Sequence, residues 1–338
     1  MTIKILDNIE IKKNNLKESF EMDVLAGLSS KNKYIPSKYF YDDQGSRLFS
    51  KITDVDEYYL TSCEEHILKK YGHEVGQLLG ENKQFNLIEL GVGDGRKTKI
   101  LLRSFIESQL NFDYISIDIS ESTVRDLDKN LSFEFPELQH IGVVGEYLDA
   151  IDWIKDNKQG VNVILFLGSS IGNFNEESAL VFLRSLWKHL NRHDYLLIGF
   201  DLKKEINILN QAYNDSQGVT KDFNFNILSR INYELGGTFD CHKFVHHGVY
   251  NPVSGAMESY LIAKEAHSVY IEALERCFNF KEFESIHLEY SYKYLSEDIH
   301  HFAVNSGYKP INNFYDKKKY FTDSLWQVKK SKKRIAKL

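Results

Sequence analysis

The chain has 338 residues and a formal net charge of -6, so it lacks the excess of Lys and Arg that a nucleic-acid-binding face requires. Twenty Tyr and 22 Phe beside only 4 Pro exclude low-complexity disorder. No apolar run is long enough to span a bilayer, and the N-terminus lacks the apolar centre of a signal peptide. We therefore predict a soluble cytoplasmic protein that acts on a small molecule and binds neither nucleic acid nor a membrane.

Residues 1–60 are predicted to form a helical, tyrosine-rich segment that completes the site. Apolar side chains recur at helical spacing over 16–28, which predicts a helix packed on the main domain. The glycine and the paired aspartates at 42–46 indicate a turn, and Thr61 begins a capped helix. A single tyrosine of this segment, taken alone, is expected to pack in a helical layer with its hydroxyl at the surface.

A buried strand at 87–90 and the glycines that follow it begin the nucleotide domain, which is predicted to span residues 61–201. Gly91, Gly93 and Gly95 alternate directly after the strand. Glycine allows so sharp a turn together with the close approach of a ligand. The apolar residues of the next segment, 96–108, share one side and predict a helix. A nucleotide-like ligand is therefore expected on this turn.

The spacing of the turn separates two classes of ligand. Dinucleotide sites use G-x-G-x-x-G and place a pyrophosphate at the helix N-terminus. Here the spacing is G-x-G-x-G, and Asp94 lies within the turn. A carboxylate there would repel a pyrophosphate but would tolerate a cationic sulfonium. The turn therefore favours S-adenosylmethionine over a nicotinamide cofactor.

Further strands are predicted at 113–120, 139–144, 161–167 and 195–200. Because they alternate with helical segments, we expect a doubly wound parallel sheet whose ligands bind beyond the carboxyl ends of the strands. An acidic side chain at the end of the second strand would accept both ribose hydroxyls, and an acidic and aromatic pair after the third would hold an adenine. The residues expected along this edge are Gly91, Asp118, Glu146, Asn173 and Asp201.

Residues 202–284 break this alternation and are predicted to form an inserted α+β substrate-binding domain. A helical run ends at Gly236 and Gly237, and two alternating segments flank a hairpin loop at 251–255. These segments predict a pair of antiparallel strands. The insertion into a nucleotide domain indicates a role in substrate binding.

Residues 285–330 are predicted to complete the main sheet and the substrate pocket. The sheet is expected to resume with a strand at 285–294, followed by a helix that Ser296 caps and a final strand at 324–328. The basic residues 331–338 are predicted to be a solvated tail.

No metal site is predicted. The three cysteines lie far apart in the sequence and form no paired metal or redox spacing. The histidines at 246–247 and at 300–301 are adjacent in sequence, so they point apart on a strand or a helix.

Six motifs, in this order, carry a resemblance to a known family: FYDDQGSRLF, ITDVDEYYLT, ELGVGDGRKT, FLGSSIGN, AYNDSQGVTKDFNFN and EYSYKY. Together they resemble the histidine-specific S-adenosylmethionine-dependent methyltransferases over residues 23–328. The resemblance implies a Rossmann-like class I methyltransferase fold. It also implies methylation, in three successive steps, of the α-amino group of L-histidine to the betaine hercynine, as in ergothioneine biosynthesis.

The resemblance implies a set of cofactor contacts on the nucleotide domain. The residues that match the family's S-adenosylmethionine site are Gly91, Gly93, Lys97, Asp118, Glu146 and Tyr147. The chain departs from the family pattern in two places. Where this chain has Glu146 and Tyr147, the family commonly has aspartate and phenylalanine. Where this chain has D-G-R in the glycine turn, the ergothioneine branch tends to have serine or threonine.

The resemblance also implies a set of substrate contacts. The residues that match the amino-acid pocket are Tyr58, Asn173, Tyr213, Glu289 and Ser291, and Tyr41 matches a tyrosine close to the amine. In the family the asparagine and the second tyrosine hold the carboxylate. Glu289 and Ser291 are two apart on a predicted strand, so both side chains point to one face and can grip the two ring nitrogens of an imidazole.

Other functions remain open from the residues. The same fold could methylate a related amine, such as 5-thiohistidine on the ovothiol route or a tryptophan-derived amine. A protein of another class, either a non-catalytic S-adenosylmethionine-binding protein or a nicotinamide enzyme, would carry a similar turn. The sequence contains no signal for an oligomeric state.

Overall fold

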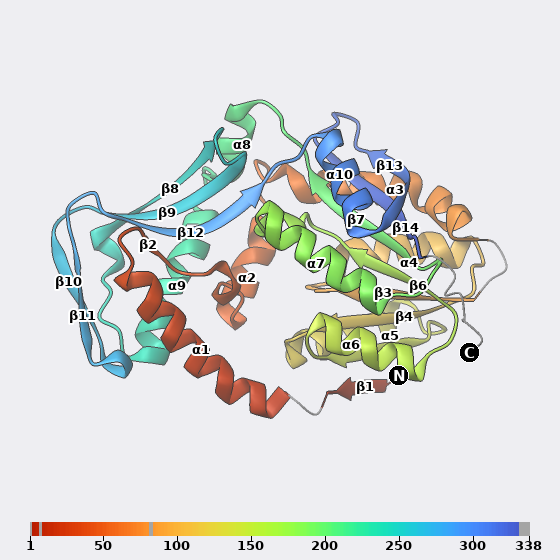
Figure 1. The fold of residues 1–338 in the computed structure, drawn as a ribbon, viewed down its shortest axis with the longest axis horizontal. Helices are drawn as coiled ribbons and strands as arrows, with labels where there is room; N and C mark the ends of the chain where they lie inside the picture. Colours follow the sequence, from red (N-terminus) through yellow and green to blue (C-terminus); the bar gives the residue numbers. More distant parts are fainter. Residues whose placement is uncertain (1, 7–8, 81–83, 331–338) are drawn as a thin grey trace, which may run out of the picture. The chain divides into compact units, whose positions relative to one another are not determined.

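The computed structural model describes residues 2–6, 9–80 and 84–330 (Figure 1). Within these residues the chain divides into two compact units. The first unit contains the described parts of Met1–Ile9, Leu60–Leu202 and Tyr294–Leu338. The second unit contains Glu10–Tyr59 and Lys203–Lys293, so the chain enters it twice. The predicted basic tail at 331–338 lies outside the described residues.

An eight-stranded sheet forms the centre of the first unit. In spatial order its strands are β1 (Thr2–Ile5), β5 (His140–Val144), β4 (Phe112–Asp118), β3 (Phe85–Leu90), β6 (Val161–Phe166), β7 (Tyr195–Asp201), β14 (Phe321–Val328) and β13 (Tyr308–Tyr315). The strands from β1 to β7 pair in parallel, whereas β14 runs antiparallel to both β7 and β13. This is the doubly wound arrangement that the alternation of strands and helices predicts.

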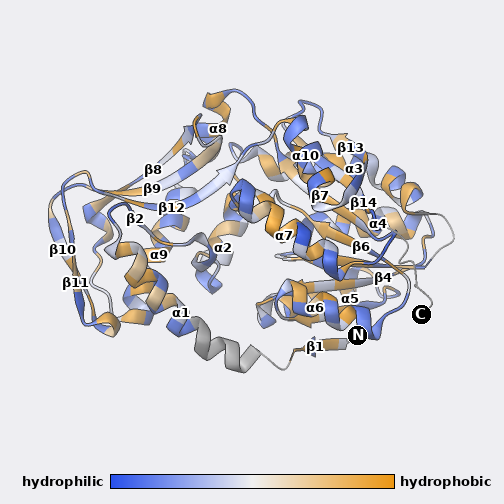
Figure 2. Ribbon diagram, viewed as in Figure 1, coloured by the Kyte–Doolittle hydropathy of each residue, from blue (hydrophilic) through white to orange (hydrophobic). Residues whose placement is uncertain are grey.

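Hydrophobic strands at the centre and helices on the faces explain why this sheet is stable. All six residues of β3 are buried, as expected for a strand covered on both faces. Figure 2 shows that apolar residues dominate the central strands. The helices of this unit are α3 (Tyr59–Gly80), α4 (Arg96–Glu107), α5 (Glu121–Glu134), α6 (Tyr147–Asn157), α7 (Glu176–His189) and α10 (Ser296–Ser306). Leu101, Leu102 and Phe105 of α4 are fully buried, which confirms the predicted apolar side of that helix.

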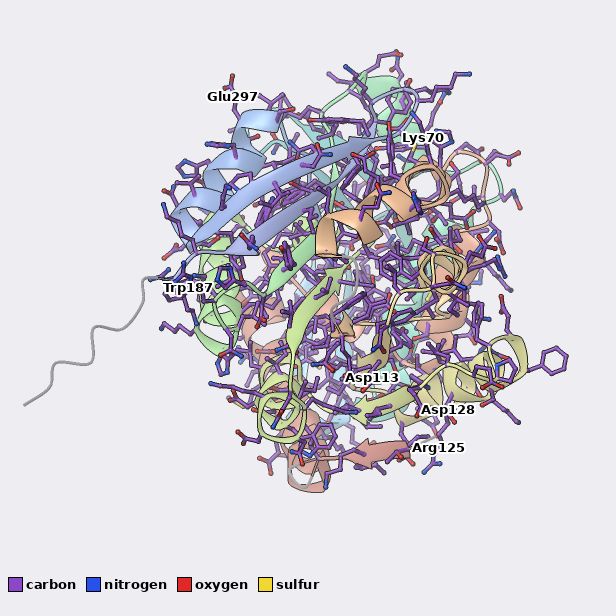
Figure 3. The ribbon with its side chains drawn as sticks, turned by 90° about the vertical axis from the view of Figure 1, so that its right-hand side faces the viewer. Lys70, Asp113, Arg125, Asp128, Trp187 and Glu297 are labelled. Atoms are coloured by element: carbon purple, nitrogen blue, oxygen red, sulfur yellow. The ribbon has the colours of Figure 1, made fainter. Side chains whose placement is uncertain are left out.

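One buried histidine of the first unit has a structural role. His140 in β5 makes a hydrogen bond of 2.9 Å with Ser116 Oγ and one of 2.8 Å with Asp128 Oδ1. Asp128 is labelled in Figure 3, on the helix α5 that packs on β5. Both ring nitrogens therefore have partners within the fold, and burial lowers the pKa of this imidazole.

The second unit is built on a smaller sheet of four strands in the order β2 (Lys33–Tyr34), β12 (Ser285–Tyr292), β9 (Ala256–Ala263) and β8 (Phe244–Asn251). A separate hairpin pairs β10 (His267–Ile271) with β11 (Arg276–Phe280). The helices are α1 (Ile9–Ser29), α2 (Asp43–Ile52), α8 (Ile206–Ala212) and α9 (Val219–Leu235). Residues from α2, α9 and the sheet share one hydrophobic core. Because this core joins the N-terminal segment to the 203–293 block, the two stretches fold as one unit.

Two predicted features of the second unit are confirmed. β8 and β9 pair in an antiparallel hairpin from Asn251 to Ala256. Helix α9 ends at Leu235, and Gly236 caps it with φ of +65°, a left-handed conformation that glycine adopts at little cost.

Two other predictions are wrong. The strand at 285–294 does not resume the main sheet, because β12 pairs with β9 and β2 in the smaller sheet. Alternating polarity predicts a strand but does not specify its partner. Residues 42–46 do not form an isolated turn. Asp42 caps helix α2 by accepting a hydrogen bond of 2.7 Å from the backbone N–H of Gly45. A Cβ at Gly45 would lie 1.7 Å from the Phe40 carbonyl oxygen, which explains the glycine.

Candidate functional site

The glycine turn of the first unit has the geometry that the sequence predicts. β3 ends at Leu90, α4 begins at Arg96, and Gly91, Gly93 and Gly95 between them have φ of +72°, +54° and +67°. A Cβ at Gly91 would lie 2.6 Å from the hydroxyl of Tyr147, whereas a Cβ at Gly93 would meet nothing within 4 Å. The left-handed backbone therefore requires glycine, and the space beside Gly93 is open to a ligand.

Asp118 lies at the end of β4 and against this turn. Its Oδ1 accepts a hydrogen bond of 2.9 Å from the backbone N–H of Ser120. Burial raises the pKa of this carboxyl group, and hydrogen bonds from backbone N–H groups, including those of Gly93 and Val92, oppose the rise. The structure therefore brings Asp118 to the glycine turn, as predicted for a residue that receives ribose hydroxyls.

Tyr147 and Glu146 stand at the start of α6. Glu146 is the exposed N-cap residue, and Tyr147 places its hydroxyl over Gly91. Burial, together with the nearby carboxylates of Asp118 and Glu89, raises the pKa of Tyr147 to about 12. The phenol therefore stays neutral at physiological pH. The two predicted adenine residues thus lie at the same end of the sheet as the glycine turn.

Lys97 forms an ion pair with a residue that sequence reasoning missed. Its Nζ lies 2.6 Å from Oε2 of Glu64, which is 1% exposed. Burial lowers the pKa of Lys97, but Glu64 together with Glu89 and Asp323 raises it by more, so the ammonium is favoured. The two oxygens of Glu64 also accept the backbone N–H of Gly168, at 2.8 and 3.0 Å. Glu64 thus ties the first turn of α4 to the loop after β6.

A further carboxyl group, Asp323 of β14, lies in the same buried region. Burial and then the negative charge of Glu64 raise the pKa of Asp323 well above its usual value. In the sequence, Glu64 belongs to the T-S-C-E-E motif, which we interpreted only as the capped start of a helix.

Glu89 is buried at the end of β3, where it accepts hydrogen bonds from the hydroxyls of Thr98 and Tyr114. Burial raises the pKa of Glu89 from its ordinary value of 4.5 to about 7. Because the folded protein holds this proton more tightly than the unfolded chain does, stability falls as pH rises from about 4.5 to about 7. Between pH 5 and pH 8 the loss is about 2 to 3 kcal/mol.

We expect the variant Glu89→Gln to remove this dependence. Its unfolding free energy, relative to that of the wild type, should increase by about 2 to 3 kcal/mol between pH 5 and pH 8. Urea denaturation at several pH values measures the difference. Glu107→Gln, at the exposed end of α4, is the matched control. A difference that does not change with pH would contradict the assignment.

The predicted substrate residues on β12 share one face because they are two residues apart, and an irregularity before them sets which face of the sheet that is. The register shifts between His287 and Glu289, so that Glu289 pairs with Ser259 and Ser291 pairs with Met257. Without the extra residue, Glu289 would face the opposite side of the sheet. Burial raises the pKa of Glu289 to about 7, and the charge of Lys293 opposes the rise.

Ser291, Tyr213 and Lys293 form a compact buried group. The hydroxyl of Tyr213 donates a hydrogen bond of 2.7 Å to Ser291 Oγ. Lys293 Nζ donates to Ser291 Oγ at 2.8 Å and to Tyr213 Oη at 2.9 Å. The three residues are 6%, 7% and 2% exposed. Tyr213 is held there by the connection between α8 and α9, so the chain brings two distant motifs to one place.

An aromatic series continues from this group. The ring of Tyr58 lies 6.3 Å from that of Tyr213 and 6.4 Å from that of Phe49, measured between centroids. Phe49 in turn lies 5.5 Å from Tyr41 and 5.9 Å from Phe223. These contacts connect four predicted residues of the second unit, Tyr41, Tyr58, Tyr213 and Ser291, into one cluster, and Glu289 lies on the same face of β12 as Ser291.

Sequence reasoning missed three members of this cluster. Lys293 continues the alternation of Glu289 and Ser291, and the EYSYKY motif contains it. Phe49 is the last residue of FYDDQGSRLF, and Phe223 lies in the AYNDSQGVTKDFNFN motif. The signal was therefore present in the motifs, but only packing shows that these side chains meet the others.

Asn173 is not part of that cluster, because it belongs to the first unit. It ends the short 3-10 helix η2 (Ser170–Asn173) after β6 and is exposed. Tyr294 Oη donates a hydrogen bond of 3.2 Å to the Ile171 carbonyl and holds this helix. The structure thus places Asn173 at the carboxyl end of a strand of the main sheet.

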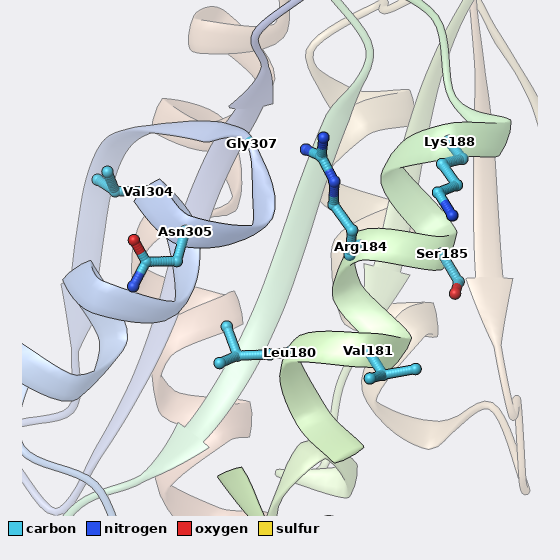
Figure 4. A pocket seen from close by; sticks show the side chains of 8 residues that line it. All are labelled: Leu180, Val181, Arg184, Ser185, Lys188, Val304, Asn305 and Gly307. Carbon is cyan, nitrogen blue, oxygen red and sulfur yellow. The ribbon is translucent and has the colours of Figure 1, made fainter. Parts of the chain in front are cut away.

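One surface pocket of the first unit is unrelated to these residues. Figure 4 shows it between α7 and α10, with Arg184 and Lys188 on α7 and Asn305 next to Gly307. Its lining includes none of the predicted site residues. Within the described parts of the chain, no group of three or more His, Cys, Asp or Glu could hold a metal ion. No helix in those parts has both the length and the apolar character needed to cross a membrane.

Comparison with known proteins agrees with this geometry. The family model for histidine-specific, S-adenosylmethionine-dependent methyltransferases matches residues 20–328. A histidine N-alpha-methyltransferase of Mycolicibacterium smegmatis is 34% identical over 282 residues, which cover 83% of this chain and 86% of that protein. Ergothioneine biosynthesis protein 1 of Schizosaccharomyces pombe is 33% identical over 85% of this chain, which spans 38% of that relative. The N-methyltransferase imqF of Aspergillus flavus is 28% identical and covers 95% of this chain and 88% of its own length.

The fold, the glycine turn and the family match lead to one assignment. The order β5-β4-β3-β6-β7-β14-β13, with β14 antiparallel, is the Rossmann-like class I methyltransferase fold. The cofactor is S-adenosylmethionine, which excludes the nicotinamide enzyme and confirms the prediction made from the G-x-G-x-G spacing. Because the match extends over nearly the whole chain, the protein is an enzyme that belongs to the family of S-adenosylmethionine-dependent, histidine-specific methyltransferases.

Proposed function

We propose that this enzyme methylates the α-amino group of L-histidine, in three successive steps, to give hercynine. The observation that carries the proposal is that Glu289 and Ser291, two residues apart in a regularly paired stretch of β12, point to the same face of the strand. A carboxylate accepts one imidazole N–H while a hydroxyl bonds the other ring nitrogen, so the pair matches the two nitrogens of the ring. The name of the bacterial relative supports the same substrate, and the name of the fungal relative supports a role in ergothioneine biosynthesis.

The aromatic series suits the product of such a reaction. Methylation converts the amine into a quaternary ammonium, and aromatic faces attract such cations by about 0.5 to 2 kcal/mol per contact. Tyr41 is 44% exposed and packs against Phe49 and Phe223, so it is the member of the series that we assign to the amine. Tyr58 lies between this group and Tyr213.

The cofactor residues of the first unit have complementary roles. We propose that Asp118 binds the ribose hydroxyls and that Glu146 and Tyr147 bind the adenine. The glycines at 91 and 93 allow the ligand to approach the backbone closely. Lys97 is held by Glu64 and contributes a fixed positive charge. When bound, S-adenosylmethionine supplies an electrophilic methyl group on a sulfonium.

The chain needs no strong base for this chemistry. An amine with an ordinary pKa of about 8 is partly unprotonated at cellular pH, so its lone pair is available. The enzyme's main contribution is then to align the reacting groups, which can lower a barrier by on the order of 7 kcal/mol. Asn173 is the residue that we assign to the substrate carboxylate, whereas Tyr213, whose hydroxyl proton is donated to Ser291, contributes to the pocket by holding Ser291.

Incubation with methyl-labelled S-adenosylmethionine and a panel of amines tests the proposal. The panel contains L-histidine, 5-thiohistidine and tryptamine, and mass spectrometry identifies each product. We expect histidine to gain three methyl groups. If 5-thiohistidine or tryptamine is methylated faster than histidine, that amine is the preferred substrate. If none of the amines is methylated, the proposal is overturned.

A further inference from the structure

The hydrogen bonds around Ser291 have a fixed direction because one partner is a lysine. An ammonium group has three N–H donors and no acceptor, so Lys293 must donate to both hydroxyl oxygens that it contacts. Tyr213 Oη accepts one of these bonds and uses its own proton to donate to Ser291 Oγ. Ser291 Oγ is therefore the acceptor in both of its hydrogen bonds, from Tyr213 and from Lys293.

A serine hydroxyl has two lone pairs and one proton. In this structure the two lone pairs of Ser291 Oγ are occupied by Lys293 at 2.8 Å and by Tyr213 at 2.7 Å. The remaining bonding capacity of Ser291 is its own O–H, which can only donate. Any ring nitrogen that binds to Ser291 must consequently present a lone pair.

We propose that Lys293 makes Ser291 an obligate hydrogen-bond donor and thereby restricts the substrate to a neutral imidazole ring. The inference rests on the proposed function. Glu289 accepts the single N–H of the neutral ring, and Ser291 donates to the other nitrogen, so one tautomer is selected. An imidazolium has N–H groups on both nitrogens and meets an O–H donor where it needs an acceptor. Lys293 is thus a positioning residue that acts through Ser291.

The charges around the group add to this selection. Lys293 is 2% exposed, and its positive charge disfavours a second cation beside Ser291. Glu289 lies on the same strand, and Tyr213 faces the lysine from the connection between α8 and α9. The backbone N–H of Lys293 donates to the Gly255 carbonyl at 3.0 Å, and the side chain of Lys203 runs beside that glycine.

Glu258 is the other carboxyl group on the four strands of this sheet, and it is occupied elsewhere. Glu258 pairs with Tyr290 in the register and so belongs to the opposite face of the sheet from Ser291. Its carboxylate accepts hydrogen bonds from Asn251, Ser254 and Tyr260. The ring of Tyr58 contacts that of Tyr213. Glu289 is therefore the anion on this face that remains for the ring N–H.

The test compares two substrates whose rings differ in basicity. L-Histidine protonates its ring near pH 6.5, whereas the ring of 1,2,4-triazol-3-yl-L-alanine stays neutral from pH 5.5 to pH 7.5. The ratio of their KM values cancels the titration of Glu289 and, in large part, that of the amine. The neutral fraction of histidine falls about tenfold over this range. We expect the KM ratio of histidine to the triazole to rise about tenfold between pH 7.5 and pH 5.5 in the wild type.

The variant Lys293→Met should abolish this rise, because one lone pair of Ser291 becomes free to accept an N–H of imidazolium. We expect its KM ratio to change less than about twofold or to reverse over the same range. Lys264→Met, an exposed lysine that follows β9, is the matched control and should retain the wild-type rise. If Lys293→Met does not fold, Tyr213→Phe frees the other lone pair of Ser291 and should flatten the ratio in the same way.

Two outcomes overturn the inference. One is a wild-type KM ratio that does not depend on pH, and the other is a Lys293→Met ratio that keeps the full tenfold rise. Failure of the proposed function has a different signature, because then neither histidine nor the triazole is methylated at any pH.

Discussion

Replacing Glu289 by alanine is expected to raise the KM for histidine by about 100-fold while the Kd for S-adenosylmethionine stays within about twofold of the wild-type value. The carboxylate sits beside Ser291 on one face of β12, and a buried hydrogen bond to a charged group is worth about 1.5 to 3 kcal/mol. Steady-state kinetics with varied histidine measure the first quantity, and calorimetric titration of the cofactor measures the second.

The neighbouring variant Glu282→Ala is the control for the Glu289 prediction, because this exposed glutamate precedes the same strand. Glu289→Gln keeps the shape and one carbonyl oxygen, so its KM should lie between those of the alanine variant and the wild type. Unchanged histidine kinetics in Glu289→Ala would contradict the assignment of the substrate's imidazole ring to this face of β12. A large rise in the cofactor Kd would instead indicate a general structural defect.

Asp118→Ala is expected to weaken the binding of S-adenosylmethionine by about 50-fold with little change in the KM for histidine at saturating cofactor. A carboxylate that accepts two ribose hydroxyls provides two charge-assisted hydrogen bonds, each stronger than a neutral one. Asp118 also receives backbone N–H groups of the glycine turn, so denaturation curves should accompany the titration.

Asp113 offers a matched control for Asp118 at the opposite end of the same strand. Its carboxylate forms an ion pair of 2.8 Å with Lys158, and it is labelled in Figure 3. Asp113→Ala should leave the cofactor Kd unchanged, because ligands of such sheets bind beyond the carboxyl ends of the strands. A normal cofactor titration for Asp118→Ala would contradict our placement of the ribose.

The buried charges of the first unit show what sequence patterns leave out. Glu64 is 33 residues before Lys97 and 104 before Gly168, yet its carboxylate lies 2.6 Å from the Lys97 ammonium and accepts the backbone N–H of Gly168. Asp323 reaches the same region from β14. Such contacts depend on which strands and helices become neighbours, and local propensity does not determine that.

The second unit makes the same point for the substrate residues. The sequence predicted that Glu289 and Ser291 share a face, and the register confirms it. It did not predict that β12 leaves the main sheet, that the strand is irregular after His287, or that Lys293 and Tyr213 meet Ser291 in a buried group.

The amino-acid sequence by itself determined the elements whose signals are local: the strand, glycine turn and helix at the cofactor site, the alternation that produces a doubly wound sheet, and the ordered motifs of the family. Tertiary structure alone decided the pairing of β12, the burial that raises the pKa of Glu89 and Glu289, and the partners of Lys97 and Lys293. The reason is physical. Backbone conformation follows from neighbouring residues, whereas desolvation and hydrogen-bond direction depend on groups that only the folded chain brings within about 3 Å of one another.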